Sequence, residues 1–177
     1  ALGAIDDRGF SGVHPEVTDR RARAERLDET LEILKLAWQG EPFSYEGTHY
    51  RVDDLVIQPR PVNGDIPIWV VGAWPREKSM GRAAKYEGVL PTQAGSFEQL
   101  SPDQVAEIAA WIAERRGENS PSNIVLEGTT PGDDAEAARA QVVPYADAGA
   151  TWWIESMWGD YSLDDLKRRI EQGPPAV

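Results

Sequence analysis

The sequence predicts an α/β fold in which short strands alternate with helices. Four short apolar segments, rich in β-branched and aromatic residues, recur in the second part of the chain. Each is followed by a segment whose apolar residues repeat every three or four positions. The apolar segments also lack clean alternation, which is typical of a parallel sheet covered by helices.

Two architectures fit this pattern: an open doubly wound sheet and part of a (β/α)8 barrel. A complete barrel takes eight such units and typically ~250 residues, whereas this chain has 177 residues and four units. If the fold is a barrel, the chain forms about half of it. We expect residues 1–177 to form a single domain, because the length suits one core and nothing requires two.

Residues 1–65 are predicted to form a loop, a helix and a hairpin. Thr18-Asp19 marks the start of the helix and Gly40 its end, and its apolar stripe consists of Ala24, Leu27, Leu31, Leu34 and Trp38. Aromatic residues on both sides of Glu46-Gly47 predict a β-hairpin, in which we expect His49 to be a surface cross-strand partner. A proline-rich connector, residues 59–67, leads into the next strand.

Residues 66–177 contain the four βα units. The predicted strands are residues 66–72, 88–92, 123–129 and 150–156. The predicted helices are residues 76–86, a helix that starts with a capping box at Ser101 and ends at Gly117, one from about Asp134 that is interrupted or kinked at Pro144, and one that starts at Ser162. In the last helix, Leu163, Leu166 and Ile170 form an apolar stripe.

The formal net charge of −12 excludes some classes of partner. With 30 acidic residues against 18 basic ones, nucleic acid and anionic membrane surfaces are not expected to bind. No apolar stretch could span a bilayer, so we expect a cytoplasmic location. The absence of cysteine and the presence of only two histidines predict no metal site. The chain opens on Ala1 without a methionine, which indicates processing or a missing front end.

The carboxyl ends of the strands are where a parallel α/β sheet binds its ligands. There, Gly72-Ala73 leaves the backbone open to a phosphate or a flat ring, although Gly72 could equally permit a tight turn while Trp74 packs on a helix. Gly128-Thr129-Thr130 repeats the pattern at the third strand, where the threonines could instead cap the next helix. The two strong nucleotide fingerprints, GxGxxG and GxxxxGK[ST], are absent.

Two carboxylates, Glu127 and Glu155, lie near the ends of successive strands. With tryptophans nearby, such a pair suits a glycoside hydrolase, which needs one acid and one base or nucleophile. Glu155 could equally form an internal ion pair with Arg168 or Arg169. The adjacent Trp152 and Trp153 must face opposite ways on a strand, so at most one of them points into a cleft.

The order of these segments resembles the luciferase-like flavin-dependent oxidoreductases, which include bacterial-luciferase-type monooxygenases and deazaflavin (F420)-dependent relatives. The resemblance is carried by RLDETLEILKLAWQGEPFSYEGTHYRVDDLVIQPRPV followed by IPIWVVGAWP, and later by YADAGATWWIES and RRIEQGPP. It implies the carboxyl-terminal half of a (β/α)8 TIM barrel with a β-hairpin insertion. Residues 1–4 would end the fourth strand, and the four units would be strands five to eight.

The resemblance also implies a site. The strand-five ending, Val71 to Trp74 (Val71, Gly72, Ala73 and Trp74), would contact FMN or F420, although Ala73 replaces a glycine and its methyl group would crowd the cofactor. Gly128 and Thr129 would lie near the phosphate end of the cofactor. Trp153 and Glu155 would line the substrate side, and His14 and Glu155 are the candidate catalytic residues.

Half a barrel would expose two strand edges and its inner wall. We therefore expect a partner for these surfaces: the rest of a longer protein, a second copy in a homodimer, or a separate subunit. The expected function is an FMN- or F420-dependent oxidoreductase or monooxygenase acting on a small organic substrate. The alternative is a non-catalytic cofactor-binding or structural subunit.

Overall fold

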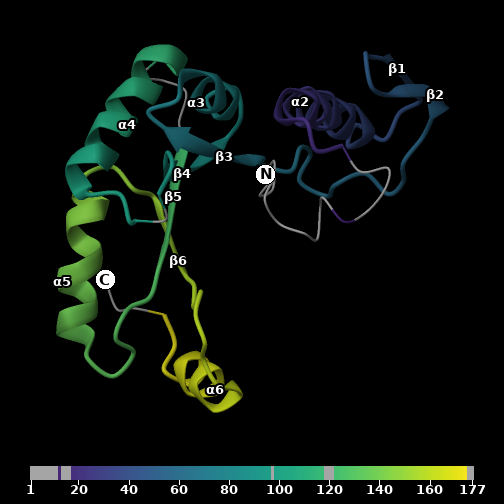
Figure 1. Cartoon of the computed structure of the whole chain (residues 1–177). Coiled ribbons are helices and arrows are strands. Elements are labelled where there is room, and N and C mark those ends of the chain that lie inside the picture. The colour runs from purple at the N-terminus through teal and green to yellow at the C-terminus, as the bar shows by residue number, and fades with distance from the viewer. Residues whose placement is uncertain (1–11, 13–16, 97, 118–121, 175–177) are drawn as a thin grey trace. The chain divides into compact units, whose positions relative to one another are not determined.

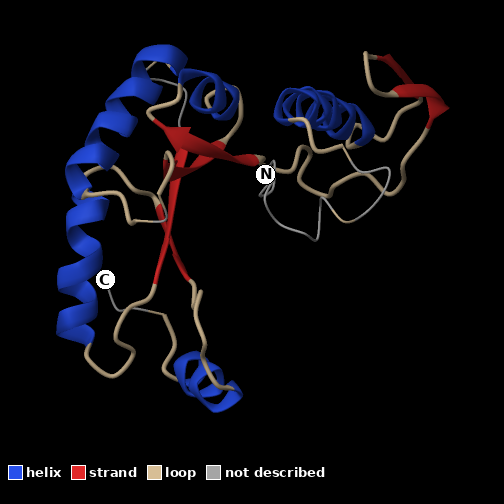
Figure 2. Cartoon of the chain, viewed as in Figure 1, coloured by secondary structure: helices blue, strands red, loops and turns tan. Residues whose placement is uncertain are grey.

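The structure is a computed structural model that describes residues 12, 17–96, 98–117 and 122–174. The chain divides into two compact units, one up to Pro67 and one from Ile68 onward, and each is described by itself (Figures 1 and 2). The expectation of a single domain over residues 1–177 stays a prediction. Within the described ranges, no helix combines the length and apolar character needed to cross a membrane.

The described part of the first unit contains helix α2 (Arg20–Ala37) and the antiparallel strands β1 (Phe43–Glu46) and β2 (Arg51–Leu55). The predicted helix and hairpin are therefore both confirmed. The helix starts where the sequence predicts, because the Asp19 carboxylate accepts a hydrogen bond from the backbone N–H of Ala22 at 2.8 Å.

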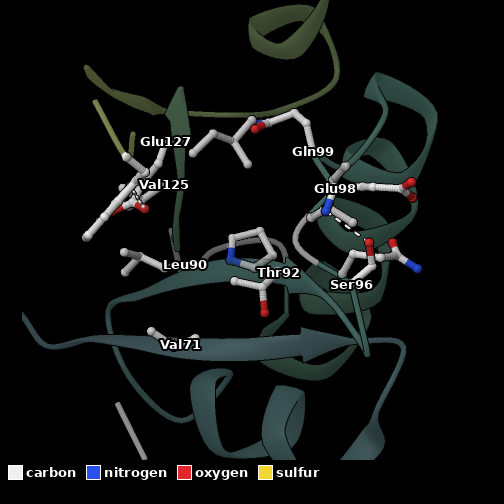
Figure 3. Close-up of a pocket in the computed structure, with 13 residues that line it drawn as sticks. Val71, Leu90, Thr92, Ser96, Glu98, Gln99, Val125 and Glu127 are labelled. Atoms are coloured by element: carbon white, nitrogen blue, oxygen red, sulfur yellow. Dashed lines mark hydrogen bonds between the residues drawn. The ribbon is translucent and has the colours of Figure 1, made fainter. Parts of the chain in front are cut away.

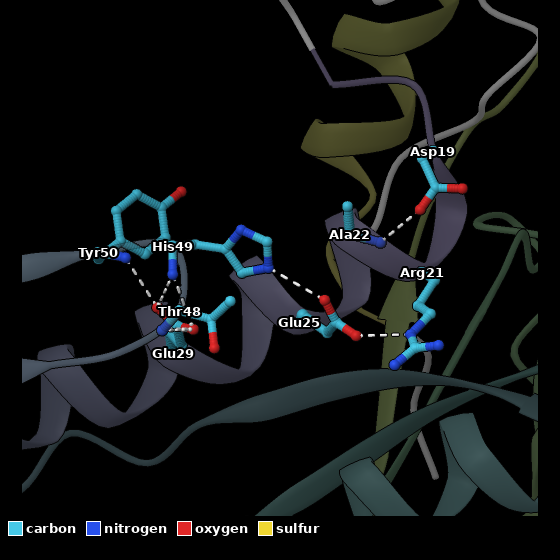
Figure 4. A network of polar contacts seen from close by, with 8 residues as sticks. All are labelled: Asp19, Arg21, Ala22, Glu25, Glu29, Thr48, His49 and Tyr50. Carbon is cyan, nitrogen blue, oxygen red and sulfur yellow. Dashed lines mark hydrogen bonds and ion pairs between the residues drawn. The ribbon is translucent and has the colours of Figure 1, made fainter.

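A carboxylate on α2 holds the turn of the hairpin (Figure 4). Glu29 accepts hydrogen bonds from the backbone N–H groups of Thr48, His49 and Tyr50 at 2.8 to 3.1 Å. His49 was predicted to be a cross-strand partner, and that prediction is wrong. Its Nε2 lies 3.1 Å from Glu25 of the helix, because the turn folds onto α2 and turns the imidazole toward it.

We expect the attachment of the hairpin to weaken in acid. Desolvation raises the pKa of Glu29, but the three backbone N–H groups outweigh it and hold the pKa below its ordinary 4.5. Its contribution is therefore complete above the ordinary pKa and is lost as the pH falls through the lower folded value. Hydrogen exchange at Thr48 and Tyr50, corrected for intrinsic rates, should show less protection at about pH 3 than near neutrality. Glu29→Gln should remove this dependence; equal wild-type protection at both pH values would contradict the expectation.

The second unit is a four-stranded parallel sheet with helices between and after its strands (Figure 2). The strands are β3 (Trp69–Trp74), β4 (Gly88–Gln93), β5 (Asn123–Gly128) and β6 (Trp152–Glu155). The helices are α3 (Glu77–Ala83), α4 (Pro102–Arg116), α5 (Ala135–Asp147) and α6 (Leu163–Glu171). All four predicted units are present, and β3 starts three residues after the predicted 66.

The strand order decides between the two predicted architectures. It runs β3-β4-β5-β6 without a reversal, whereas a doubly wound sheet reverses its order at a switch point. Right-handed crossovers in a constant direction place successive helices on one face of the sheet. The predicted α/β fold with parallel barrel-type strands is thereby confirmed.

The core lies between the sheet and these helices. Ile108, Val105 and Ile112 of α4 are buried, as their spacing predicts, and they face a sheet whose buried side chains include Val70, Val89, Ile124 and Leu126. The predicted capping box at Ser101 is also present: its hydroxyl accepts from the N–H of Gln104, whose side chain accepts from the N–H of Ser101.

Two helices differ from their sequence patterns. Pro144 was predicted to interrupt or kink its helix; α5 continues past it to Asp147, so Pro144 does not interrupt the helix. The apolar stripe of α6 would ordinarily face a core, yet Leu163 and Ile170 are 65% and 77% exposed. The helix is held instead by Arg169, the residue of α6 that is buried.

Candidate functional site

Each strand presents alternate residues to the helices and to the opposite face, here called the inner face. The strand register identifies the two sets. Ala73 pairs with Thr92, and Glu127 pairs with Ile154, so these residues form the inner row nearest the carboxyl ends. Val71 pairs with Leu90, and Val125 with Trp152, in the row before it.

A cavity of about 650 Å³ lies over the carboxyl-terminal part of this inner face (Figure 3). Its floor contains Val71, Leu90 and Val125, and its polar edge contains Thr92 and Glu127. The rest of the lining comes from strand residues and from the loops after β4 and β6: Pro91, Gln93, Ser96, Glu98, Gln99, Leu100, Leu126 and Trp158. The cavity therefore lies at the end of the sheet where parallel α/β folds bind ligands.

Some polar side chains that line the cavity form hydrogen bonds with neighbouring side chains. The indole N–H of Trp158 donates to the Glu127 carboxylate at 3.3 Å. Gln93 accepts from the amide of Gln104 on α4 at 2.9 Å. Two lining residues, Glu98 and Glu127, carry carboxylates, and none of the described lining residues is Lys or Arg. In the described part of the chain, no group of three or more His, Cys, Asp or Glu residues could hold a metal ion.

At the opposite, amino-terminal end of the strands the inner face is covered by tryptophan. The indole of Trp69 lies against Gly88, where a Cβ atom would collide with it. The same ring lies 5.4 Å from the ring of Trp152, centroid to centroid, although their strands β3 and β6 are the outermost of the sheet. This contact closes the inner face below the cavity.

The carboxyl ends of β5 and β6 are joined by side-chain hydrogen bonds. The Thr129 hydroxyl donates to the carbonyl oxygen of Ser156 at 2.6 Å, and the N–H of Ser156 donates to the Gly128 carbonyl at 2.8 Å. The Ser156 hydroxyl is buried and has no hydrogen-bond partner among the described residues.

Beneath that rim lies an ion pair between β6 and α6. Arg169 donates from Nε to Glu155 at 3.2 Å and from a terminal nitrogen to the Thr130 hydroxyl at 3.1 Å. Glu155 also accepts from the N–H and hydroxyl of Thr130 at 2.6 and 2.9 Å. Desolvation raises the pKa of Glu155, but the hydrogen bonds from Thr130 and Arg169 outweigh it and lower the pKa below its ordinary value.

The predicted cofactor contacts on β3 fall on both faces of the sheet. Val71 and Ala73 belong to the inner face, and Val71 lines the cavity. Gly72 faces α3, where a Cβ atom would lie 2.6 Å from the Met80 sulfur. Trp74 faces α4 and makes an edge contact with Trp111 at 6.2 Å between ring centroids. Packing on a helix is the alternative that the sequence left open for Trp74, whereas for Gly72 that alternative was a tight turn and the structure instead places it against Met80.

The remaining predicted residues lie mostly on the helix side. Gly128 lies under Trp153, whose ring contacts Tyr145 of α5 at 5.7 Å. Trp152 faces the other way, as predicted. Glu127 lines the cavity while Glu155 is paired with Arg169, so these carboxylates point to opposite faces and do not flank one bond. His14 and residues 1–4 lie outside the described residues.

Sequence reasoning pointed to the carboxyl ends of the strands, which include Leu90 and Thr92, but it did not single out Val125 or Glu98 among the residues that line the cavity. Thr92 carried a usable signal, because it is a polar residue at the carboxyl end of an otherwise apolar strand. Leu90 and Val125 carried none, because the helix-facing residues beside them, such as Val89 and Ile124, are equally apolar.

Comparison with known proteins gives consistent results. The family model of luciferase-like monooxygenases matches residues 3–172. F420-dependent glucose-6-phosphate dehydrogenase of Mycolicibacterium gilvum is 30% identical over 112 residues, 63% of this chain and 31% of that protein. The enzyme of the same name from Mycobacterium avium is 31% identical over 98 residues, 55% of this chain and 27% of that protein. The matches thus span about a third or less of these relatives.

A solved structure supports the fold. The coenzyme F420 dependent tetrahydromethanopterin reductase of Methanopyrus kandleri, a TIM barrel, superposes with a TM-score of 0.68 at 14% identity. The superposition covers 97% of this chain and 70% of the reductase. At this identity the likeness shows the fold alone, whereas the family model covers nearly the whole sequence. The chain therefore belongs to the luciferase-like monooxygenase family.

Proposed function

We propose that this chain forms part of an F420-dependent oxidoreductase and contributes the wall against which the deazaflavin ring and a small organic substrate lie. The observation that carries this proposal is the cavity over the carboxyl ends of β3 to β5. The names of the matched relatives favour F420 over FMN. When bound, the cofactor would supply hydride chemistry, and the protein would supply position and surroundings.

The lining residues suit the ring of such a cofactor. Val71 and Leu90 offer an apolar surface to one face of a flat heterocycle, whereas Val125 is 1% exposed and adds little. Thr92 offers a hydroxyl at the edge of the ring. Since no described lining residue is Lys or Arg, the cavity offers no counter-charge to the phosphate-bearing tail. Of the cofactor, we therefore assign only the ring to this cavity.

Each of these side chains would have a simple task. The apolar floor would exclude water from one side of the ring, which strengthens the polar contacts at its edge. Thr92 would orient the ring through a hydrogen bond. Trp158, which is 83% exposed and tied to Glu127, would cover the side nearest the loop after β6.

Titration with F420, followed by cofactor fluorescence, tests this proposal. The wild-type chain should bind F420 with micromolar affinity and more tightly than FMN. Val71→Trp should cover part of the cavity floor with an indole ring and weaken F420 binding by at least about tenfold, which corresponds to about 1.4 kcal/mol. The control Leu163→Trp changes an exposed residue of α6 outside the lining and should leave binding unchanged. Absence of F420 binding, tighter binding of FMN, or equal effects of both variants would contradict the proposal.

A further inference from the structure

The charges around the cavity are of one sign. Glu127 lies at the carboxyl end of β5, and Glu98 lies in the loop after β4; Figure 3 shows them on opposite sides of the cavity. The apolar residues Val71, Leu90 and Val125 lie on the same side of the cavity as Glu127. The other polar lining groups are neutral hydroxyls and amides, and none of the described lining residues is basic. A ligand in this space therefore meets hydrocarbon and negative charge, and no positive charge from the described lining.

The Glu127 carboxylate is combined with an aromatic ring. Trp158 donates its indole N–H to Glu127 at 3.3 Å, which keeps the ring beside the carboxylate, and the ring is 83% exposed. An indole face attracts cations through its quadrupole, and tryptophan is the strongest side chain in this respect. A carboxylate beside such a ring adds a direct Coulomb attraction for the same cation.

We propose that the substrate held in this cavity is a small organic cation, an amine with a hydrocarbon body. The ammonium group would lie at Glu127 and Trp158, and the hydrocarbon would lie over the apolar floor of the cavity, in contact with the cofactor ring when that is bound. A phosphorylated or carboxylated compound would meet like charge at both Glu98 and Glu127, so the cavity would reject it. This inference rests on the proposed function only in taking the cavity as the substrate's place.

The proposal sets this chain apart from its matched relatives. Their names give glucose 6-phosphate as substrate, a compound that carries a phosphate group. A site for a phosphate needs basic side chains or a cluster of free N–H groups. The described lining of this cavity instead contains two carboxylates.

A charge series of aromatic probes tests the inference without F420. Benzylamine, benzyl alcohol, phenylacetate and phenyl phosphate share a benzene ring and differ mainly in the charge of their polar group. Binding to the wild-type chain would be measured by saturation-transfer NMR and competition at neutral pH. The salt concentration should be about 0.15 M, which screens the long-range field of a chain with net charge −12.

The expected order is benzylamine, then benzyl alcohol, then the two anions. Benzylamine should bind at least about tenfold more tightly than phenylacetate, since attraction is replaced by repulsion. Glu127→Gln should reduce this preference by about threefold, and Trp158→Ala by a similar factor. The matched control Glu107→Gln removes the same charge from an exposed position on α4 outside the lining and should leave the preference unchanged.

Several results would overturn the inference. Phenylacetate or phenyl phosphate binding as tightly as benzylamine would do so, and so would no binding by any probe. If the preference for benzylamine survives Glu127→Gln, or if Glu107→Gln reduces it equally, the preference comes from the net charge of the chain and not from the cavity. Because the probes are tested without cofactor, failure of F420 binding with retained amine preference would overturn the proposed cofactor and leave this inference intact.

Discussion

Replacing Arg169 by alanine is expected to lower the free energy of unfolding of the second unit by about 3 kcal/mol. The Arg169 side chain is 10% exposed and that of Glu155 is 19% exposed, so the pair is largely shielded from water. Without the guanidinium, Glu155 would remain desolvated with an uncompensated charge. The Thr130 hydroxyl and the Gly173 carbonyl would lose their donors in the same change.

The neighbouring arginine provides a matched control. Arg168 pairs with Asp165 at 3.2 Å, but its side chain is 66% exposed. An exposed pair of this kind contributes little, so Arg168→Ala should cost less than about 0.5 kcal/mol. Urea denaturation followed by circular dichroism measures both variants, and equal losses would show that the buried pair does not anchor α6. The loss in Arg169→Ala should also shrink in acid, where protonation of Glu155 removes the unpaired charge.

Gly128→Ala is expected to destabilise the second unit by about 2 kcal/mol. Gly128 faces the helix side, where the ring of Trp153 lies directly over its Cα atom. An added methyl group would enter the space of the six-membered ring of that indole. The ring is held from its other side by Tyr145, so it can move away only by disturbing the contact between β6 and α5.

Gly81→Ala is the matched control for Gly128→Ala. Gly81 lies in α3, and a Cβ atom built there has no heavy atom within 4 Å. The same substitution should therefore stabilise the unit by about 0.5 to 1 kcal/mol, because alanine loses less conformational entropy in a helix. Thermal and urea unfolding of the two variants should shift in opposite directions. A destabilisation by Gly81→Ala, or none by Gly128→Ala, would contradict the packing described for these glycines.

The elements of the fold were predictable where their signals are local. The hairpin followed from aromatic residues around Glu46-Gly47, and the start of α4 from Ser101 and Gln104. These patterns specify backbone hydrogen bonds within a few residues, and tertiary context did not change them. The exposed stripe of α6 shows what such patterns cannot predict. Leu163 and Ile170 mark the face that the helix could bury, but the pattern does not tell whether another part of the protein covers that face.

The site was less predictable, because it depends on the face toward which each strand residue points. A strand that is buried on both faces shows no alternation of apolar and polar residues. The sequence therefore does not tell toward which face Val71 or Gly72 points. The structure separates them: Val71 lines the cavity, and Gly72 packs against Met80. The pairing of Glu155 with Arg169 was one of two readings of the sequence, and only the position of α6 decides it.

Because of the contact between Trp69 and Trp152, the two ends of the sheet differ in how well they tolerate substitutions. The amino-terminal end is locked by large interdependent rings, so a substitution there disturbs several strands at once. At the carboxyl-terminal end, the loops after β4 and β6 contribute side chains to the cavity. During evolution, substitutions in the loops can therefore change the ligand that is bound, while the tryptophan packing that holds the strands together is retained.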